Sequence, residues 1–192
     1  MICRSEKYLY YLLFFLLFPA CSDYSPKPAG YFRIDLIDPV YSSMDTFASF
    51  RLAVSNQARI VLLPSDNNDF FFNIDYPALN AQIYCSYFPL TEGKLAQFSE
   101  ESRTFAYRHV IKAEAIQERT YENPAQKVYG LIYSMKGNVA SPVQFVLTDS
   151  VHSFFRGALY FNHTPNQDSI APVLEHINRD INVLIENFQW KK

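Results

Sequence analysis

Residue types that build common catalytic sites are scarce in this chain of 192 residues. It has three cysteines, five glycines and four histidines, which are His109, His152, His163 and His176. The histidines do not follow HExxH or a related ligand spacing. The chain also lacks a GxSxG nucleophile motif, a Walker loop and a GxGxxG motif, and five glycines leave little material for a phosphate-binding loop. The usual signatures of zinc hydrolases, serine hydrolases and nucleotide-binding enzymes are therefore missing.

An excess of charge of one sign is also missing. The chain holds 17 basic and 19 acidic side chains, a net charge of −2, and no run of like charge is longer than the terminal Lys191-Lys192. Proteins that bind nucleic acid usually carry a basic patch or stripe, and proteins that adsorb to anionic lipid carry a basic cluster. We therefore expect no nucleic-acid partner and no membrane attachment by charge alone.

The first twenty residues have the organisation of a signal peptide. A basic start with Arg4 and Lys7 is followed by an uncharged apolar run, Tyr8 to Ala20. This run is shorter than the roughly 20 apolar residues that span a bilayer, and it ends in a small residue directly before Cys21. We predict that residues 1–20 are removed and that Cys21 becomes the lipid-modified first residue. An ordinary secreted protein with a coincidental cysteine is the alternative.

The residues after Cys21 predict a tether. Residues 21–30 are polar and rich in proline, a composition typical of a spacer. Each buried methylene of an acyl chain such as palmitate adds about 0.8 kcal/mol, and stable anchoring takes two chains or more. A lipid-anchored Cys21 would therefore hold the domain permanently at a membrane surface.

One cysteine remains for the folded domain. Cys3 leaves with the signal peptide and Cys21 is acylated, so Cys85 has no partner for a disulfide or a cysteine metal site in the mature chain. It alternates with Ile83 and Tyr87, which predicts a buried, inert thiol.

The strand pattern predicts a sheet within a single α+β domain over residues 31–192. Alternating or apolar segments bounded by turn residues predict strands at 31–36, 50–54, 58–63, 70–76, 81–88, 116–121, 127–135, 143–148 and 154–161. The connections are too short for repeated βαβ crossovers, so we expect a largely antiparallel sheet of six to eight strands packed against two helices. This order of elements resembles the PsbP/Mog1-like sandwich.

Two segments have helical rather than strand periodicity. The spacing of Leu95, Phe98, Ser102 and Phe105 predicts an amphipathic helix over about residues 91–109. A continuous apolar stripe from Ile170 to Phe188 predicts a second helix. Asp168 or Ser169 would cap the start of that helix.

The loop of residues 162–168 (NHTPNQD) is one candidate for catalysis. It brings His163 and Asp168 near Ser169, which is the composition of a Ser/His/Asp triad. The same residues suit a turn followed by a helix cap, and we favour that interpretation.

A second candidate is the carboxylate pair Asp35 and Asp38, with Arg33 nearby. Paired carboxylates can perform acid–base catalysis, but exposed acids at strand ends are far commoner. We therefore predict no catalytic residues, no cofactor, no metal and no enzymatic activity.

Several strings of the chain, taken together and in order, resemble one family. They are residues 21–36 (CSDYSPKPAGYFRIDL), 111–116 (IKAEAI), 127–147 (KVYGLIYSMKGNVASPVQFVL), 148–160 (TDSVHSFFRGALY) and 165–173 (PNQDSIAPV), followed by Phe188 to Trp190. The family is GldD, the gliding-motility lipoprotein of Bacteroidota. The chain departs from the family pattern at two places. Ala29 stands where a basic residue is expected, and Phe18-Pro19 are unusual in the lipobox, the short segment that precedes the lipid-modified cysteine.

The resemblance implies a role in the envelope machinery for gliding motility and type IX protein secretion, and no established catalytic activity. We expect an assembly or stabilising component, anchored through Cys21 in the outer membrane and facing the periplasm. Its implied partners are other Gld lipoproteins and type IX secretion components. Candidate contact residues are Lys27, Tyr31 and Arg33 near the anchor and Lys136, Gly137 and Asn138 at a hairpin tip. The alternative is a lipoprotein that binds a small ligand or a peptidoglycan fragment in a concave pocket.

Two tripeptides resemble the periplasmic O-glycosylation acceptor of the same phylum, in which Asp-Ser or Asp-Thr precedes an apolar residue. They are Asp149-Ser150-Val151 and Asp168-Ser169-Ile170. Glycan would then be carried by Ser150 or Ser169. Turn and capping chemistry explains the same residues and is the interpretation we favour.

Overall fold

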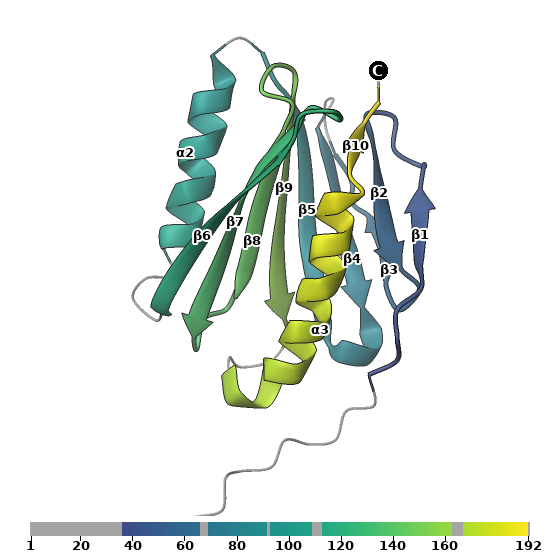
Figure 1. Ribbon diagram of the computed structural model, residues 1–192, viewed down its shortest axis with the longest axis vertical. Coiled ribbons are helices and arrows are strands. Elements are labelled where there is room, and N and C mark those ends of the chain that lie inside the picture. The colour runs from purple at the N-terminus through teal and green to yellow at the C-terminus, as the bar shows by residue number, and fades with distance from the viewer. Residues whose placement is uncertain (1–35, 66–68, 92, 109–112, 163–166, 192) are drawn as a thin grey trace, which may run out of the picture. The chain divides into compact units, whose positions relative to one another are not determined.

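Runs of strands are separated by single helices along the chain, which is the order of an α+β domain. The computed structural model describes residues 36–65, 69–91, 93–108, 113–162 and 167–191, which all belong to one compact unit of residues 32–192. Its elements, shown in Figure 1, are β1 (Tyr41–Met44), β2 (Phe50–Ser55), β3 (Arg59–Leu62), β4 (Phe70–Tyr76), the 3-10 helix η1 (Pro77–Leu79), β5 (Ala81–Pro89), α2 (Lys94–Tyr107), β6 (Ala113–Asn123), β7 (Val128–Gly137), β8 (Val143–Thr148), β9 (Ser153–Phe161), α3 (Gln167–Glu186) and β10 (Gln189–Trp190).

Seven strands form the main sheet, in the order β3-β4-β5-β9-β8-β7-β6, and every neighbouring pair is antiparallel. This confirms the predicted α+β class and the largely antiparallel sheet of six to eight strands. The prediction of one sheet is wrong in part, because β2 leaves the main sheet and pairs with β1 and β10. The short strands β1 and β10 carry little periodicity of their own and depend on β2 for their hydrogen bonds.

The two helices cover opposite faces of the main sheet. On β9, Phe155 and Leu159 face the core that includes Ile177 and Ile181 of α3, and α3 crosses in front of the sheet in Figure 1. The alternate residue Phe154 faces the other side, where Phe98 of α2 lies 5.5 Å from it between ring centroids. Successive strand residues point to opposite faces, so α2 and α3 must lie on different sides.

The second, three-stranded sheet closes the α3 side of the core with aromatic rings. Phe50 of β2 lies 5.5 Å from Phe188, 5.3 Å from Phe155 and 6.1 Å from Phe72 between ring centroids. All four side chains are buried. Burial of each stabilises the fold by about 1.5–3 kcal/mol, so these ring contacts help to hold the second sheet against the main sheet.

One buried carboxylate joins the two sheets to α3. Asp180 of α3 accepts hydrogen bonds from the hydroxyl of Tyr41 at 2.7 Å and from the hydroxyl of Tyr76 at 3.1 Å. Tyr41 belongs to β1 and Tyr76 to β4. Burial, followed by the contact with Asp180, raises the pKa of Tyr41 to about 12 and raises the pKa of Tyr76 further.

The helix predictions need two corrections. Helix α3 begins at Gln167, so Asp168 and Ser169 lie in its first turn rather than at its cap. On α2 the buried positions are Ser102 and Ala106, whereas Phe105 is 38% exposed.

The predicted strand at residues 31–36 falls almost wholly outside the described residues, and Leu36 is not in a strand.

Candidate functional site

A groove lies on the α2 side of the main sheet, beside the C-terminal end of the helix. Its volume is about 470 Å³. We call it the basic groove, and its lining consists of Tyr84 and Ser86 of β5, Gln144 of β8, Arg156, Ala158 and Tyr160 of β9, and Phe105 and Arg108 at the end of α2.

Strand register explains why these residues meet. Ser86 pairs with Arg156, and Tyr84 pairs with Ala158. On the other side of β9, Ala158 pairs with Gln144. Because side chains alternate along each strand, the paired residues all point to the face opposite α3.

The centre of the groove is an aromatic ring between two guanidinium groups. The Phe105 ring centroid lies 4.8 Å from Cζ of Arg156 and 5.1 Å from Cζ of Arg108. Both distances fall within the range of cation–π attraction. Arg108 is also the C-terminal cap residue of α2, where the helix dipole favours a positive charge.

The charged side chains that line the groove are both basic. None of its lining residues is acidic, and the ion pairs formed among the described residues include neither Arg108 nor Arg156. Burial lowers the pKa of Arg156, and the charge of nearby Glu101 partly offsets this. Arginine stays protonated at neutral pH even so, and two positive charges therefore face the groove.

Tyrosines form the apolar end of the groove. The rings of Tyr84 and Tyr160 meet edge to face at 5.2 Å between centroids. The Tyr84 hydroxyl accepts a hydrogen bond from Nε2 of Gln82 at 2.6 Å, and Gln82 also donates to Asn162 at 3.1 Å. The arrangement suits a ligand that has both an anionic group and an apolar or peptide-like part.

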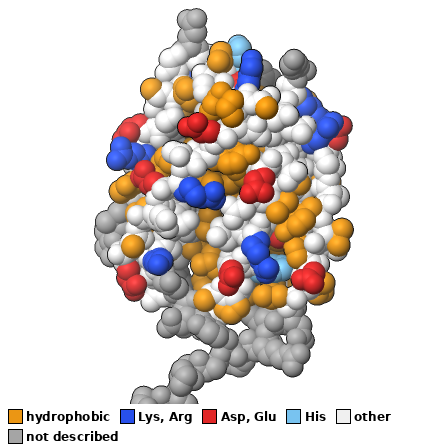
Figure 2. All heavy atoms as spheres, in the orientation of Figure 1, with side chains coloured by type: hydrophobic (Ala, Val, Ile, Leu, Met, Phe, Trp, Pro, Cys, Tyr) orange, Lys and Arg blue, Asp and Glu red, His pale blue; other side chains and the backbone are white. Residues whose placement is uncertain are grey.

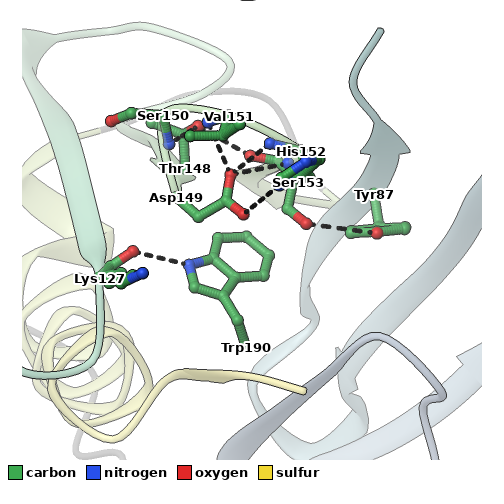
Figure 3. A network of polar contacts seen from close by, with 9 residues as sticks. All are labelled: Tyr87, Lys127, Thr148, Asp149, Ser150, Val151, His152, Ser153 and Trp190. Atoms are coloured by element: carbon green, nitrogen blue, oxygen red, sulfur yellow. Dashed lines mark hydrogen bonds and ion pairs between the residues drawn. The ribbon is translucent and has the colours of Figure 1, made fainter. Parts of the chain in front are cut away.

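A second polar cluster lies in the turn between β8 and β9 (Figure 3). Oδ1 of Asp149 accepts hydrogen bonds from the backbone N–H groups of Val151, His152 and Ser153 at 2.9, 2.7 and 2.8 Å. Ser150 adopts a left-handed backbone with φ of +69° and is exposed. The Asp149 carboxylate therefore organises the turn, as the favoured interpretation required, while the Ser150 hydroxyl remains accessible. Glycosylation of Ser150 stays a prediction.

Figure 3 also shows how the C-terminal strand meets the main sheet near this turn. Nε1 of Trp190 donates a hydrogen bond to the backbone oxygen of Lys127 at 3.1 Å. The Tyr87 hydroxyl lies 3.5 Å from the Ser153 hydroxyl. These contacts hold β10 and the β8–β9 turn in place, and we assign them a structural role.

The residues predicted from sequence do not line the basic groove. Lys136 and Asn138 are exposed and Gly137 is buried. Lys136 and Gly137 are the last residues of β7, and Asn138 follows them. Ser169 is exposed in the first turn of α3, and Asp38 is exposed before β1. The remaining candidates, Cys21, Lys27, Tyr31, Arg33, Asp35 and His163, lie outside the described residues.

The basic groove itself was missed in the sequence. One signal was available, because Arg156 is the only charged residue in the strand segment FFRGALYF. A charge inside an apolar strand needs a reason, since burying it unpaired is costly. The contribution of Phe105 and Arg108 depends on where α2 packs, which no local pattern specifies.

Two further properties concern only the residues that the structure describes. They contain no group of three or more His, Cys, Asp or Glu side chains arranged to hold a metal ion. Among them, no helix combines the length and the apolar character needed to cross a membrane. On the face in Figure 2, basic and acidic side chains are scattered rather than gathered in one patch.

The fold and groove together define an α+β sandwich domain with a surface suited to binding. Residues 21–190 match the family model described as gliding motility lipoprotein GldD. Because the match covers most of the chain, the protein belongs to the GldD family of gliding motility lipoproteins, which confirms the resemblance seen in the sequence. Membership associates it with gliding motility and, as a lipoprotein, with the cell envelope. No curated protein matches the chain.

Proposed function

We propose that this protein is a non-enzymatic assembly or stabilising component of the gliding motility and type IX protein secretion machinery. Its partners are other Gld lipoproteins and type IX secretion components. Membership of the GldD family supports the setting. The observation that carries the binding role is the exposed aromatic and arginine surface of α2 and the basic groove.

This surface has the composition of a protein–protein contact. Phe105, Tyr107 and Tyr84 are 38%, 41% and 42% exposed. Cζ of Arg103 lies 5.4 Å from the Tyr107 ring centroid, so arginine accompanies the aromatic rings on both sides of the helix. Tyrosine and arginine are among the residues that dominate binding energy at interfaces. Burial of the exposed rings by a partner would add favourable binding free energy.

The proposed anchor is a lipid on Cys21, in the outer membrane and facing the periplasm. The family match begins at this residue, which follows the apolar run and Ala20. Two or more acyl chains make such an anchor stable. The anchor would keep the basic groove near other membrane-bound partners and raise their effective concentration.

A crosslinked pull-down of the tagged lipoprotein from native membranes, followed by mass spectrometry, tests the proposal. Wild type should recover other Gld lipoproteins or type IX secretion components. Phe105→Ala should recover much less of them, because it removes the central ring of the groove. Leu62→Ala is the matched control, since Leu62 is an exposed apolar side chain on β3. Recovery of the lipoprotein alone from well-crosslinked membranes would contradict the assembly role.

Binding of a small ligand or peptidoglycan fragment is the second candidate. The volume of the basic groove, about 470 Å³, falls in the range of roughly 300–1,000 Å³ found for small-molecule sites. A ligand that binds only the folded state raises the melting temperature. A rise with soluble peptidoglycan fragments that Phe105→Ala abolishes would favour this function, and no rise would remove it.

A further inference from the structure

We propose that the basic groove binds an acidic segment of a partner protein, with an aspartate or glutamate carboxylate placed between Arg108 and Arg156. The inference rests on the proposed assembly function and specifies the chemistry of its partner. Its basis is the juxtaposition of two guanidinium groups, an exposed phenylalanine and a tyrosine pair in one groove.

The position of Arg156 is the first step of the argument. It lies in the middle of β9, between Ser86 of β5 and Val146 of β8 in register. Its backbone is therefore fixed on both sides, and its side chain is partly buried. A partly buried cation loses solvation, and an anion or water can replace what is lost.

Interactions within the fold explain the position of the Arg108 charge better than that of the Arg156 charge. Arg108 is the C-terminal cap residue of α2, where the helix dipole stabilises a cation, whereas Arg156 is held in the middle of a strand. The described carboxylate whose charge acts on it is Glu101, but the two side chains form no ion pair among the described residues. The stacking on Phe105 adds attraction without neutralising the charge.

Charge complementarity indicates the anion, and the neighbouring side chains indicate its source. The groove presents two positive charges and no acidic lining residue in a chain whose net charge is −2. A guanidinium group binds a carboxylate through paired N–H donors.

A small inorganic anion would leave the exposed rings of Phe105 and Tyr84 in water, whereas a peptide covers them. Gln144 and Ser86 add groups that can hydrogen-bond to a peptide backbone. An acidic peptide segment therefore satisfies the charge, the rings and the polar side chains together.

Photocrosslinking in cells tests this directly. A benzoylphenylalanine probe replaces Tyr84, which is exposed at the groove, and crosslinked peptides are sequenced. We expect the captured segments to contain aspartate or glutamate next to the crosslink. Arg156→Gln should lower the crosslinking yield about tenfold or more, as loss of one member of a charge pair does. Arg156→Lys should retain part of the yield, because it keeps the charge and loses the paired donors.

Two further variants keep the test decisive. Arg108→Gln changes a residue at the exposed end of α2 and should also lower the yield even if Arg156→Gln folds poorly. Arg59→Gln is the matched control, because it makes the same charge change at β3, where Arg59 pairs with Asp75 at 2.7 Å.

Segments without acidic residues, a captured glycan or lipid, or a yield unchanged by both groove variants would overturn the inference. If partners still co-purify in that case, the assembly function stands and the acidic-segment inference alone fails. If no partner is captured by either method, the assembly function fails as well.

Discussion

Replacing Gly157 with alanine places a methyl group where the structure has no room for one. The new Cβ atom would lie 2.3 Å from Cζ and 2.4 Å from Cε1 of Phe145. Phe145 lies opposite Gly157 in the β8–β9 pair. Phe145 is fully buried and packs 6.1 Å from the Phe155 ring. The ring therefore cannot move aside without disturbing the core.

The size of the effect follows from overpacking rather than from backbone strain, because Gly157 does not have a positive φ. An extra methylene in a filled core costs about 1–3 kcal/mol. For a domain of this size, 1 kcal/mol lowers the melting temperature by about 2–4 °C, so Gly157→Ala should lower it by about 2–12 °C. Thermal unfolding followed by circular dichroism measures this.

A double mutant identifies the cause. Phe145→Leu removes the ring that collides with the new methyl group, so Gly157→Ala should cost less on the Phe145→Leu background than in wild type. Equal costs on both backgrounds, or an unchanged melting temperature for Gly157→Ala alone, would refute the steric argument.

Four further predictions concern buried groups and the anchor. Each oxygen of the Asp180 carboxylate accepts a hydrogen bond from one tyrosine hydroxyl. Asp180→Asn replaces one of these oxygens with an NH2 donor and removes the charge, so it should lower the free energy of unfolding by about 1–3 kcal/mol. Urea unfolding with an unchanged midpoint would contradict this. Burial and Asp180 raise the pKa of Tyr41 to about 12, above the unfolded value of about 10. The contribution of Tyr41 to stability is therefore complete below pH 10 and is lost as the pH rises toward 12. Tyr41→Phe should reduce that alkaline loss of stability, and identical pH profiles of stability for the two proteins would refute this. Burial raises the pKa of the Cys85 thiol, so iodoacetamide should label it only after unfolding, and rapid labelling of the native domain would show that it is accessible. Cys21→Ser should abolish incorporation of labelled palmitate, whereas incorporation that persists would exclude Cys21 as the lipid site.

Local periodicity was enough for most elements of the fold. Residues 70–76 and 143–148 were predicted as strands with the bounds they have in β4 and β8, because both have clear turn residues at their ends. The segments Tyr41–Met44 and Gln189–Trp190 were missed. They are short and become strands by pairing with β2, which is a long-range interaction that no local pattern encodes.

The basic groove shows the same limit for function. Its residues come from β5, α2, β8 and β9 and meet through strand register and helix packing. The amphipathic pattern grouped Phe105 with the apolar face of α2, whereas the helix turns Ala106 inward and leaves Phe105 exposed. Family resemblance indicated the biological setting from the sequence, but only the structure indicates which surface to mutate.

The most direct test of the central claim is a quantitative comparison of wild type, Phe105→Ala and Leu62→Ala captured by crosslinking from the same native membranes. The account predicts other Gld lipoproteins or type IX secretion components with wild type and Leu62→Ala, and a clear loss with Phe105→Ala. Equal recovery with all three proteins would show that the α2 surface is not the contact, and recovery of no partner with wild type would contradict the assembly function itself.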